Sequence, residues 1–157
     1  MRTDGLRWDG LRWDGLRWDG IVTLHGRVEQ RIAKALQRRH GIGLSEYRAL
    51  CRLVDADDGE LRMQELADLI GLNQSSVSRL VTRLENAGLT RRDHCPADRR
   101  GVYTQITGEG RAVQDKASPT YHAELTEALD EAAADPALAP LVHLLRTRWT
   151  RRARGPR

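Results

Sequence analysis

Apolar residues recur at spacings of three and four along most of the chain, and this pattern predicts a mainly α-helical protein. The first expected helix runs from Ile21 to about His40, and the second begins with Ser45 as its N-terminal cap. A short third helix is expected over residues 63–70. Its core-facing side chains would be Leu66, Leu69 and Ile70.

The C-terminal part of the chain continues the helical pattern. Thr107 is a suitable N-terminal cap for a long helix, in which Pro119 is expected to cause a kink. A last helix is expected to begin between Asp135 and Pro140. Its apolar face would consist of Leu138, Leu141, Val142, Leu145 and Trp149.

One segment between these helices has both of its ends marked by the sequence. Asn73 is of a type that caps helix N-termini with its side chain, and Gly88 stands where a left-handed residue would end the helix. Four apolar residues between them form the stripe of an amphipathic helix, namely Val77, Leu80, Val81 and Leu84. Together with residues 63–70, this segment predicts a helix-turn-helix.

The opposite face of this helix has short polar side chains near its start and arginines behind them. These residues are Gln74, Ser75, Ser76, Ser78, Arg79, Thr82 and Arg83. Such side chains can reach base edges and phosphates when a helix enters the DNA major groove. The alternative is an ordinary solvated surface, but helix surfaces favour Glu and Lys, whereas this one carries Ser. The pattern therefore favours a DNA recognition helix.

A hairpin is expected after the recognition helix. Residues 89–92 and 102–106 are short strand-like runs, and the Pro, Gly and Asp residues of 93–101 are typical of a loop. Arginines in and beside the loop outnumber the acids. The arginines are Arg91, Arg92, Arg99 and Arg100, and the acids are Asp93 and Asp98. A cationic wing of this kind suits a narrow minor groove, so the sequence predicts an all-α winged helix-turn-helix with a two-stranded wing.

Three stretches, GLSEYRAL, QELADLIGLNQSSVSRLVTRLENAGLTRR and DRRGVYTQITGEGR, resemble the MarR family of bacterial transcriptional regulators. The resemblance runs from about Ile21 to the C-terminal helix. Its most specific part is a wing signature, found here at Asp98, Arg100, Gly101, Ile106, Thr107 and Gly110. The resemblance implies that Asp98 holds the wing and that Arg100 probes the minor groove.

The resemblance also implies a homodimer, in most members a repressor, that small phenolic or other aromatic ligands or oxidation release from DNA. The expected DNA contacts are Gln74, Ser75, Ser76, Ser78, Arg79, Arg83, Asp98, Arg99 and Arg100. A symmetric dimer would bind a pseudo-palindromic operator. The aromatic candidates for an effector pocket are Trp18, Tyr47 and Tyr121, although each is equally well explained as a core residue.

The N-terminal segment contains the sequence LRWDG three times, over residues 6–20. A period of five matches neither a helix nor a strand, since successive copies turn by about 140° around a helix and alternate between the faces of a strand. Residues 1–17 are therefore expected to be a mostly disordered arm. The alternative is a Trp-bearing arm that packs on the dimer or over a ligand pocket.

The amino-acid composition predicts an anionic binding partner and a cellular location. The 157 residues have a formal net charge of +4, and six arginines with no acid lie between residues 144 and 157. This distribution favours a nucleic acid partner. No apolar run approaches the length of a membrane span, and no signal peptide is expected. The two cysteines fit a reducing compartment, so a cytoplasmic location without a membrane partner is expected.

The sequence gives weaker signals for metal binding, catalysis and redox chemistry than for DNA binding. No two of the five histidines share a helix at a spacing of four, so neither a zinc site nor another cofactor is expected. Ser75, Ser76 and Ser78 lack an acid or base partner, so no enzyme is expected. Two alternatives remain open: a redox-responsive regulator that uses Cys95 in its cationic surroundings, or a winged-helix module that binds protein.

The expected organisation follows from these points. After the arm, residues 18–157 would form one domain. Its winged helix-turn-helix would cover residues 44–107, and its N- and C-terminal dimerisation helices would cover 21–40 and 108–152. The expected function is a sequence-specific, DNA-binding transcriptional regulator.

Overall fold

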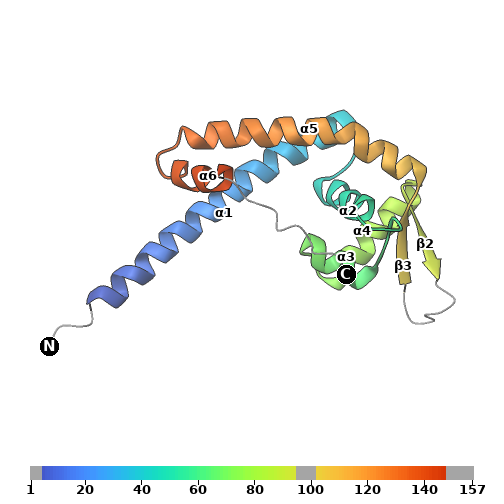
Figure 1. Cartoon of the computed structure of the whole chain (residues 1–157), viewed down its shortest axis with the longest axis horizontal. Helices are drawn as coiled ribbons and strands as arrows, with labels where there is room; N and C mark the ends of the chain where they lie inside the picture. Colours follow the sequence, from blue (N-terminus) through green and yellow to red (C-terminus); the bar gives the residue numbers. More distant parts are fainter. Residues whose placement is uncertain (1–4, 95–101, 148–157) are drawn as a thin grey trace. The chain divides into compact units, whose positions relative to one another are not determined.

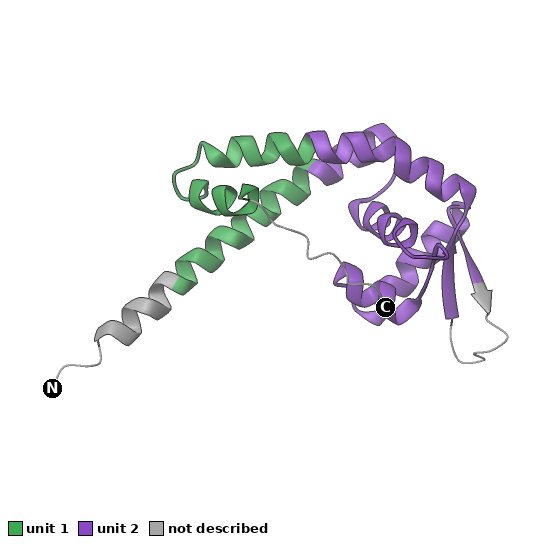
Figure 2. Cartoon of the chain, in the orientation of Figure 1, with its two compact units in different colours: residues 1–31, 124–157 green, residues 32–123 purple. Residues whose placement is uncertain are grey.

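The computed structural model describes residues 5–94 and 102–147, with side chains for residues 14–92 and 102–147. The elements are α1 (Gly5–His40), α2 (Leu44–Val54), β1 (Glu60–Arg62), α3 (Met63–Ile70), α4 (Gln74–Asn86), β2 (Thr90–His94), β3 (Val102–Ile106), α5 (Gly108–Ala133) and α6 (Ala139–Arg146) (Figure 1). The mainly helical fold with a winged helix-turn-helix is confirmed. The chain forms two compact units, residues 1–31 with 124–157 as unit 1 and residues 32–123 as unit 2 (Figure 2).

Unit 2 contains the winged helix-turn-helix, and helices α2, α3 and α4 surround its core. The largest side chains that are fully buried in this unit come from the end of α1, from these three helices and from β3. They are Ile32, Leu36, Leu50, Leu53, Leu66, Val77, Leu80, Val81, Leu84 and Thr104. Burial of this apolar surface fixes α4 with one face inward and the other toward solvent.

The wing belongs to a three-stranded antiparallel sheet with the strand order β1-β3-β2. The predicted hairpin is confirmed, and Thr90 lies opposite Ile106 in its register. The first strand was not predicted, because a three-residue strand has no periodicity to detect. It pairs along β3, with Glu60 opposite Gln105 and Arg62 opposite Tyr103.

Two local predictions in unit 2 were wrong. Helix α2 is capped at Gly43 and not at Ser45, because the Glu46 carboxylate accepts the Gly43 backbone N–H at 2.8 Å. In α3, Leu66 is fully buried as predicted, but Leu69 is 45% exposed and Ala67 is buried instead. Helix α3 buries the adjacent residues Leu66 and Ala67, so its inward side is centred on these two and Leu69 lies outside it.

Unit 1 has its own small core. Leu24 from α1 packs with Ala132, Leu138 and Val142, and Val28, Leu129 and Leu141 are packed against this cluster. The predicted start of the last helix is confirmed, since α6 begins at Ala139 with Pro140 in its first turn. Leu145 was predicted on its buried face but is 61% exposed.

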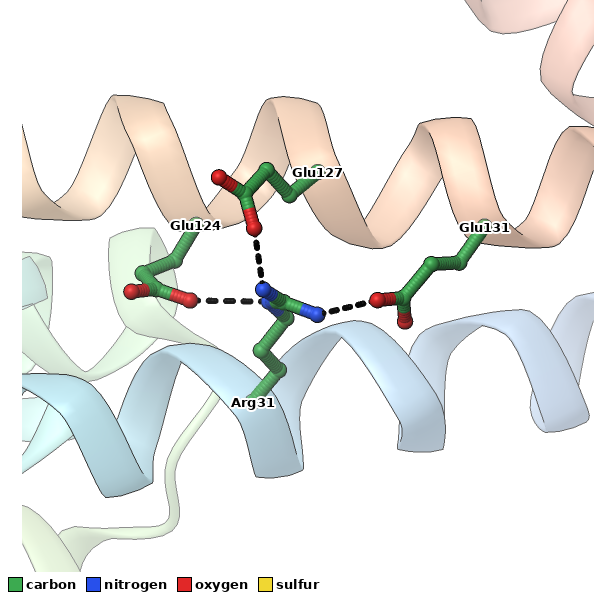
Figure 3. A network of polar contacts seen from close by, with 4 residues as sticks. All are labelled: Arg31, Glu124, Glu127 and Glu131. Atoms are coloured by element: carbon green, nitrogen blue, oxygen red, sulfur yellow. Dashed lines mark hydrogen bonds and ion pairs between the residues drawn. The ribbon is translucent and has the colours of Figure 1, made fainter.

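A charged network joins α1 and α5 within unit 1 (Figure 3). The Arg31 guanidinium binds three carboxylates of α5, with Nε at 2.8 Å from Glu124, Nη1 at 2.6 Å from Glu131, and Nη2 on Glu127. Hydrogen bonds with Glu124 and Glu131 raise the pKa of Arg31 above its ordinary value. One cation therefore neutralises part of a strongly acidic helix face.

The LRWDG repeats form part of helix α1, which begins at Gly5 and not near Ile21. Over residues 5–17 the structure therefore shows a helix where a mostly disordered arm was expected. Packed residues further along α1 can propagate a helix outward at low cost, since nucleation is already complete. The described side chains from Asp14 to Asp19 are all exposed, which agrees with the absence of an apolar stripe in the repeats. The division of the chain at residue 17 stays a prediction.

Helix α5 begins as the sequence predicted. The Thr107 hydroxyl accepts the backbone N–H of Gly110 at 3.0 Å, so Thr107 caps the first turn. The same hydroxyl donates to the Gly88 carbonyl oxygen at 2.7 Å. Helix α5 continues through Pro119 to Ala133. Thr107 therefore links the end of α4, the wing and the start of α5.

Candidate nucleic-acid interface

Both predicted ends of the recognition helix α4 are confirmed. The Asn73 side-chain oxygen accepts the Ser76 backbone N–H at 2.9 Å and the Ser75 hydroxyl at 2.9 Å. At the other end, Gly88 has a positive φ of 73°, and the Leu89 N–H bonds the Leu84 carbonyl at 2.9 Å. A left-handed residue at this point suits glycine, which has no Cβ.

The turn before α4 is equally well defined. Gly71 has a positive φ of 70° and ends α3, and the Leu72 N–H bonds the Ala67 carbonyl at 3.0 Å. Only residues 71–73 separate α3 from α4. The short connection and the caps together hold α4 in one orientation relative to α3.

The predicted division of α4 into two faces is also confirmed. Val77, Leu80, Val81 and Leu84 are buried. The polar residues Gln74, Ser75, Ser78, Arg79, Thr82 and Arg83 are exposed, and Ser76 is half-buried at the edge between the faces. The structure therefore brings the described DNA-contact candidates together on one exposed face. Their contact with DNA stays a prediction.

The wing hairpin follows directly from α4, and the described part of it carries two exposed arginines (Figure 1). Arg91 lies opposite Gln105, and its Nε donates to the Gln105 side-chain oxygen at 2.7 Å. The predicted wing contacts Asp98, Arg99 and Arg100 lie outside the described residues. So does Cys95, on which the redox alternative depends.

Two carboxylates that the sequence analysis did not select hold arginines of this surface. Glu46 of α2 accepts Arg83 Nε at 2.9 Å. Glu85 of α4 lies 3.0 Å from Arg92 Nε. By contrast, Arg79 has no hydrogen-bond or ion-pair partner among the residues that the structure describes.

No sequence signal pointed to Glu46, because it lies far from Arg83 in the chain. The Glu85 to Arg92 pair spans the end of a helix and the start of a strand, so no helical spacing indicates it either.

A further arginine and an aromatic ring pair at the outer strand of the sheet. Arg62 Nε donates to the Tyr103 hydroxyl at 2.7 Å, and the guanidinium carbon lies 5.4 Å from the Tyr103 ring centroid. Both residues come from the β1 and β3 register pair. The contact combines a hydrogen bond with a cation–π interaction and helps to hold β1 against β3.

Two of the three predicted pocket aromatics meet in unit 2. The rings of Tyr47 and Tyr121 stack at 4.9 Å between centroids, with 27° between their planes. Tyr47 is only 3% exposed, and burial raises the pKa of its hydroxyl from 10.0 to about 12. The third aromatic, Trp18, belongs to unit 1, where it is 63% exposed.

The surroundings of the tyrosine pair are polar. Tyr121 also makes an edge contact with His122 at 5.4 Å between ring centroids. Cys51 is half-buried beside them, and Gln114 Nε2 lies 3.6 Å from its sulfur. Over residues 5–94 and 102–147, no cluster of acidic, His and Cys side chains could hold a metal ion. Within the same ranges, no helix is both long and apolar enough to cross a membrane.

The chain is similar in sequence to MarR family proteins and to other transcriptional regulators. A sequence profile of the MarR family matches residues 42–102, which include α2, β1, α3, α4 and β2. The transcriptional regulator MhqR of Bacillus subtilis is 33% identical over 89 residues, which are 57% of this chain and 60% of MhqR. The chain thus spans less than two thirds of the length of the curated relatives that it matches.

Solved structures extend the likeness beyond the matched segment. Sco3205, a MarR family transcriptional regulator from Streptomyces coelicolor crystallised in complex with DNA, has a TM-score of 0.71 and 29% identity, over 84% of this chain and 83% of Sco3205. BpsR of Bordetella bronchiseptica, whose DNA binding is regulated by 6-hydroxynicotinic acid, has a TM-score of 0.61 and 25% identity, over 80% of this chain and 96% of BpsR.

Proposed function

Because the chain belongs to the MarR family, we propose that it is a transcriptional regulator that binds double-stranded DNA through α4 and the wing. The observation that carries this proposal is the composition of the two faces of α4. Its four large apolar residues are all buried, which leaves an exposed face of Gln, Ser and Arg at the start of a capped helix. The crystallised complex of Sco3205 with DNA supports the same use of the fold.

The roles of individual residues follow from their chemistry. Gln74, Ser75, Ser76 and Ser78 lie in the first turns of α4, where short polar side chains read base edges. Arg79 and Arg83 lie further along the exposed face and suit phosphates. The family resemblance gives Asp98 the role of holding the wing and Arg100 that of the minor-groove probe. Arg99 is a wing contact candidate because it adds to the positive charge of the same loop.

A homodimer would present two recognition helices to one duplex. The large apolar side chains of unit 1 that are exposed support a dimer interface there, since a partner subunit would remove their surface from water. They are Leu16, Trp18, Ile21, Val22, Leu144 and Leu145. Two-fold symmetry then predicts a pseudo-palindrome with half-sites about 10 base pairs apart, which footprinting can test. A single asymmetric half-site at saturation would contradict the dimer.

We propose further that the protein is a repressor, acting in the cytoplasm, that a small aromatic or phenolic effector releases from DNA. Regulation of BpsR by 6-hydroxynicotinic acid supports an effector of this class. The stacked Tyr47 and Tyr121 of unit 2 are candidates for the pocket wall. The assignment of Trp18 to a pocket stays a prediction from the sequence. An effector shifts the equilibrium only by its differential affinity for the free and DNA-bound states.

The DNA proposal and the effector proposal have separate experiments. A randomised duplex library is selected on the protein, and the affinity for the enriched duplex is compared with that for a scrambled duplex. Enrichment of a palindromic sequence supports DNA recognition, and equal affinity for both duplexes contradicts it. A panel of aromatic acids and phenols is then tested for release of the enriched duplex and for a raised Tm. The effector proposal fails if no compound does either.

A further inference from the structure

The side chain of Arg92 in the wing strand β2 bonds two residues of the recognition helix α4. Its Nε lies 3.0 Å from a carboxylate oxygen of Glu85, and its Nη2 donates to the Thr82 hydroxyl at 3.3 Å. Both acceptors lie on α4, three residues apart, so they share one side of the helix. The planar guanidinium thus bridges two adjacent acceptors on α4.

The Thr82 hydroxyl has a fixed role in this arrangement. It donates its proton to the Ser78 carbonyl oxygen at 2.9 Å, which leaves its lone pairs to accept from Arg92. Glu85 is the better shielded partner, with a side chain that is 21% exposed against 44% for Arg92. A bidentate contact of this kind constrains orientation as well as distance.

The geometry of this contact bears on how the wing is aimed. Strand β2 begins at Thr90, shortly after α4 ends at Asn86, and backbone bonds close the turn between them, with the Leu89 N–H on the Leu84 carbonyl at 2.9 Å. Arg92 lies beyond this turn, two residues after the strand begins. The contacts of Arg92 with Thr82 and Glu85 add a side-chain constraint four residues and one residue before the end of α4. A wing and a helix that enter different grooves must hold a set relative orientation for both to fit one site.

We propose that Arg92 is a positioning residue that sets the wing against α4, and that Glu85 strengthens DNA binding although it is an acid beside the DNA-binding face. This inference rests on the proposed DNA binding. It departs from the simple charge argument, in which every arginine near DNA contacts phosphate and every acid repels it. The two accounts make opposite predictions for Glu85.

The test uses the full-length protein, the duplex that it selects from a randomised library, and a scrambled duplex. Glu85→Ala and Arg92→Lys are each expected to weaken binding to the selected duplex several-fold, because either change breaks the bridge to α4. Lys keeps the charge but cannot span two acceptors as Arg does. The slope of log K against log salt should stay at its wild-type value in both variants, since neither loses a phosphate contact.

Two further variants complete the experiment. The double variant Glu85→Ala with Arg92→Lys should bind no more weakly than either single variant, since one interaction is lost in all three. Arg79→Gln is the control, because Arg79 has no partner among the described residues and is a candidate phosphate contact. It should flatten the salt slope by about one unit.

Several results would overturn the inference. They are tighter binding by Glu85→Ala, wild-type binding by Arg92→Lys, or a salt slope in an Arg92→Gln variant that falls as far as it does in Arg79→Gln. If Glu85→Ala fails to fold, a double variant that exchanges the two charges, Glu85→Arg with Arg92→Glu, replaces it. A higher affinity of this double variant for the selected duplex than that of Arg92→Glu alone supports the inference, and an equal or lower affinity opposes it. If the wild type binds neither duplex, the proposed function itself fails.

Discussion

The ring of Tyr47 on α2 stacks on the ring of Tyr121 on α5, with 4.9 Å between their centroids. This contact ties the long helix α5 to the helix that precedes the helix-turn-helix. Tyr47 is buried at this position, and burial raises the pKa of its hydroxyl from 10.0 to about 12. An effector that entered between the rings would have to displace this contact.

The raised pKa of Tyr47 predicts a loss of stability at alkaline pH. The folded protein holds the Tyr47 proton more tightly than the unfolded chain does, so this contribution to stability is complete below pH 10 and is lost as the pH rises toward 12. Tyr47→Phe keeps the ring and removes the titrating group. Its free energy of unfolding should therefore fall less over this range than that of the wild type. Denaturant curves that fall in parallel would contradict the assignment.

Gly110 is expected to be intolerant of a side chain. A Cβ at this position would overlap the Leu89 carbonyl oxygen and lie 2.9 Å from Ile106 Cγ1. Gly110→Ala should lower the free energy of unfolding by about 1–3 kcal/mol through overpacking. Gly108→Ala is the matched control on the same helix turn, since a Cβ there would meet nothing within 4 Å. The control should be neutral or more stable by about 0.4–1 kcal/mol; equal losses in both variants would refute the packing argument.

Two substitutions of Asn73, the cap residue of α4, are expected to affect stability and DNA binding differently. Asn73→Ala removes the acceptor of the Ser76 N–H and should cost about 1 kcal/mol of stability. Asn73→Asp keeps an acceptor and places a negative charge at the helix N-terminus, so stability should be retained. The same charge should weaken DNA binding, since it would face phosphates. Denaturant unfolding and duplex affinity are measured for both; a loss of stability in Asn73→Asp as large as in Asn73→Ala would count against the cap.

The network around Arg31 predicts unequal effects from its members. Arg31→Gln leaves three carboxylates of α5 facing one another, and Glu124 among them is buried. Removal of the cation takes a favourable interaction from all three carboxylates and leaves their mutual repulsion. Glu127→Gln removes only an exposed carboxylate and relieves repulsion. Thermal unfolding should therefore show a larger fall in Tm for Arg31→Gln, and the opposite order would show that the network does not stabilise unit 1.

Residues with strong local signals were predicted well from the sequence. Asn73 and Gly88 mark the ends of α4 by their own backbone and side-chain chemistry, and the four apolar residues between them are all buried. The hairpin has a strong signal as well, because strand-like runs flank a loop rich in turn residues. These signals are local, so no knowledge of the tertiary structure is needed to interpret them.

Features that depend on tertiary contacts were missed. Strand β1 exists because β3 offers it a partner, and nothing in its three residues shows this. The exposed Leu69 and Leu145 fit an apolar pattern that the described packing does not use. The pairing of Glu46 with Arg83 and of Glu85 with Arg92 joins separate elements. Periodicity along one helix cannot reveal which elements meet.

In the proposed mode of DNA binding, α4 reads bases while the wing supplies electrostatic attraction. The most direct measurement is the affinity of the wild type, Gln74→Ala and Arg100→Ala for the selected and the scrambled duplex over a range of salt concentrations. Arg100→Ala should weaken binding to both duplexes and flatten the salt slope by about one unit. Gln74→Ala should cost about 1–3 kcal/mol on the selected duplex and little on the scrambled one. Wild-type affinities and slopes in both variants would contradict this mode of binding.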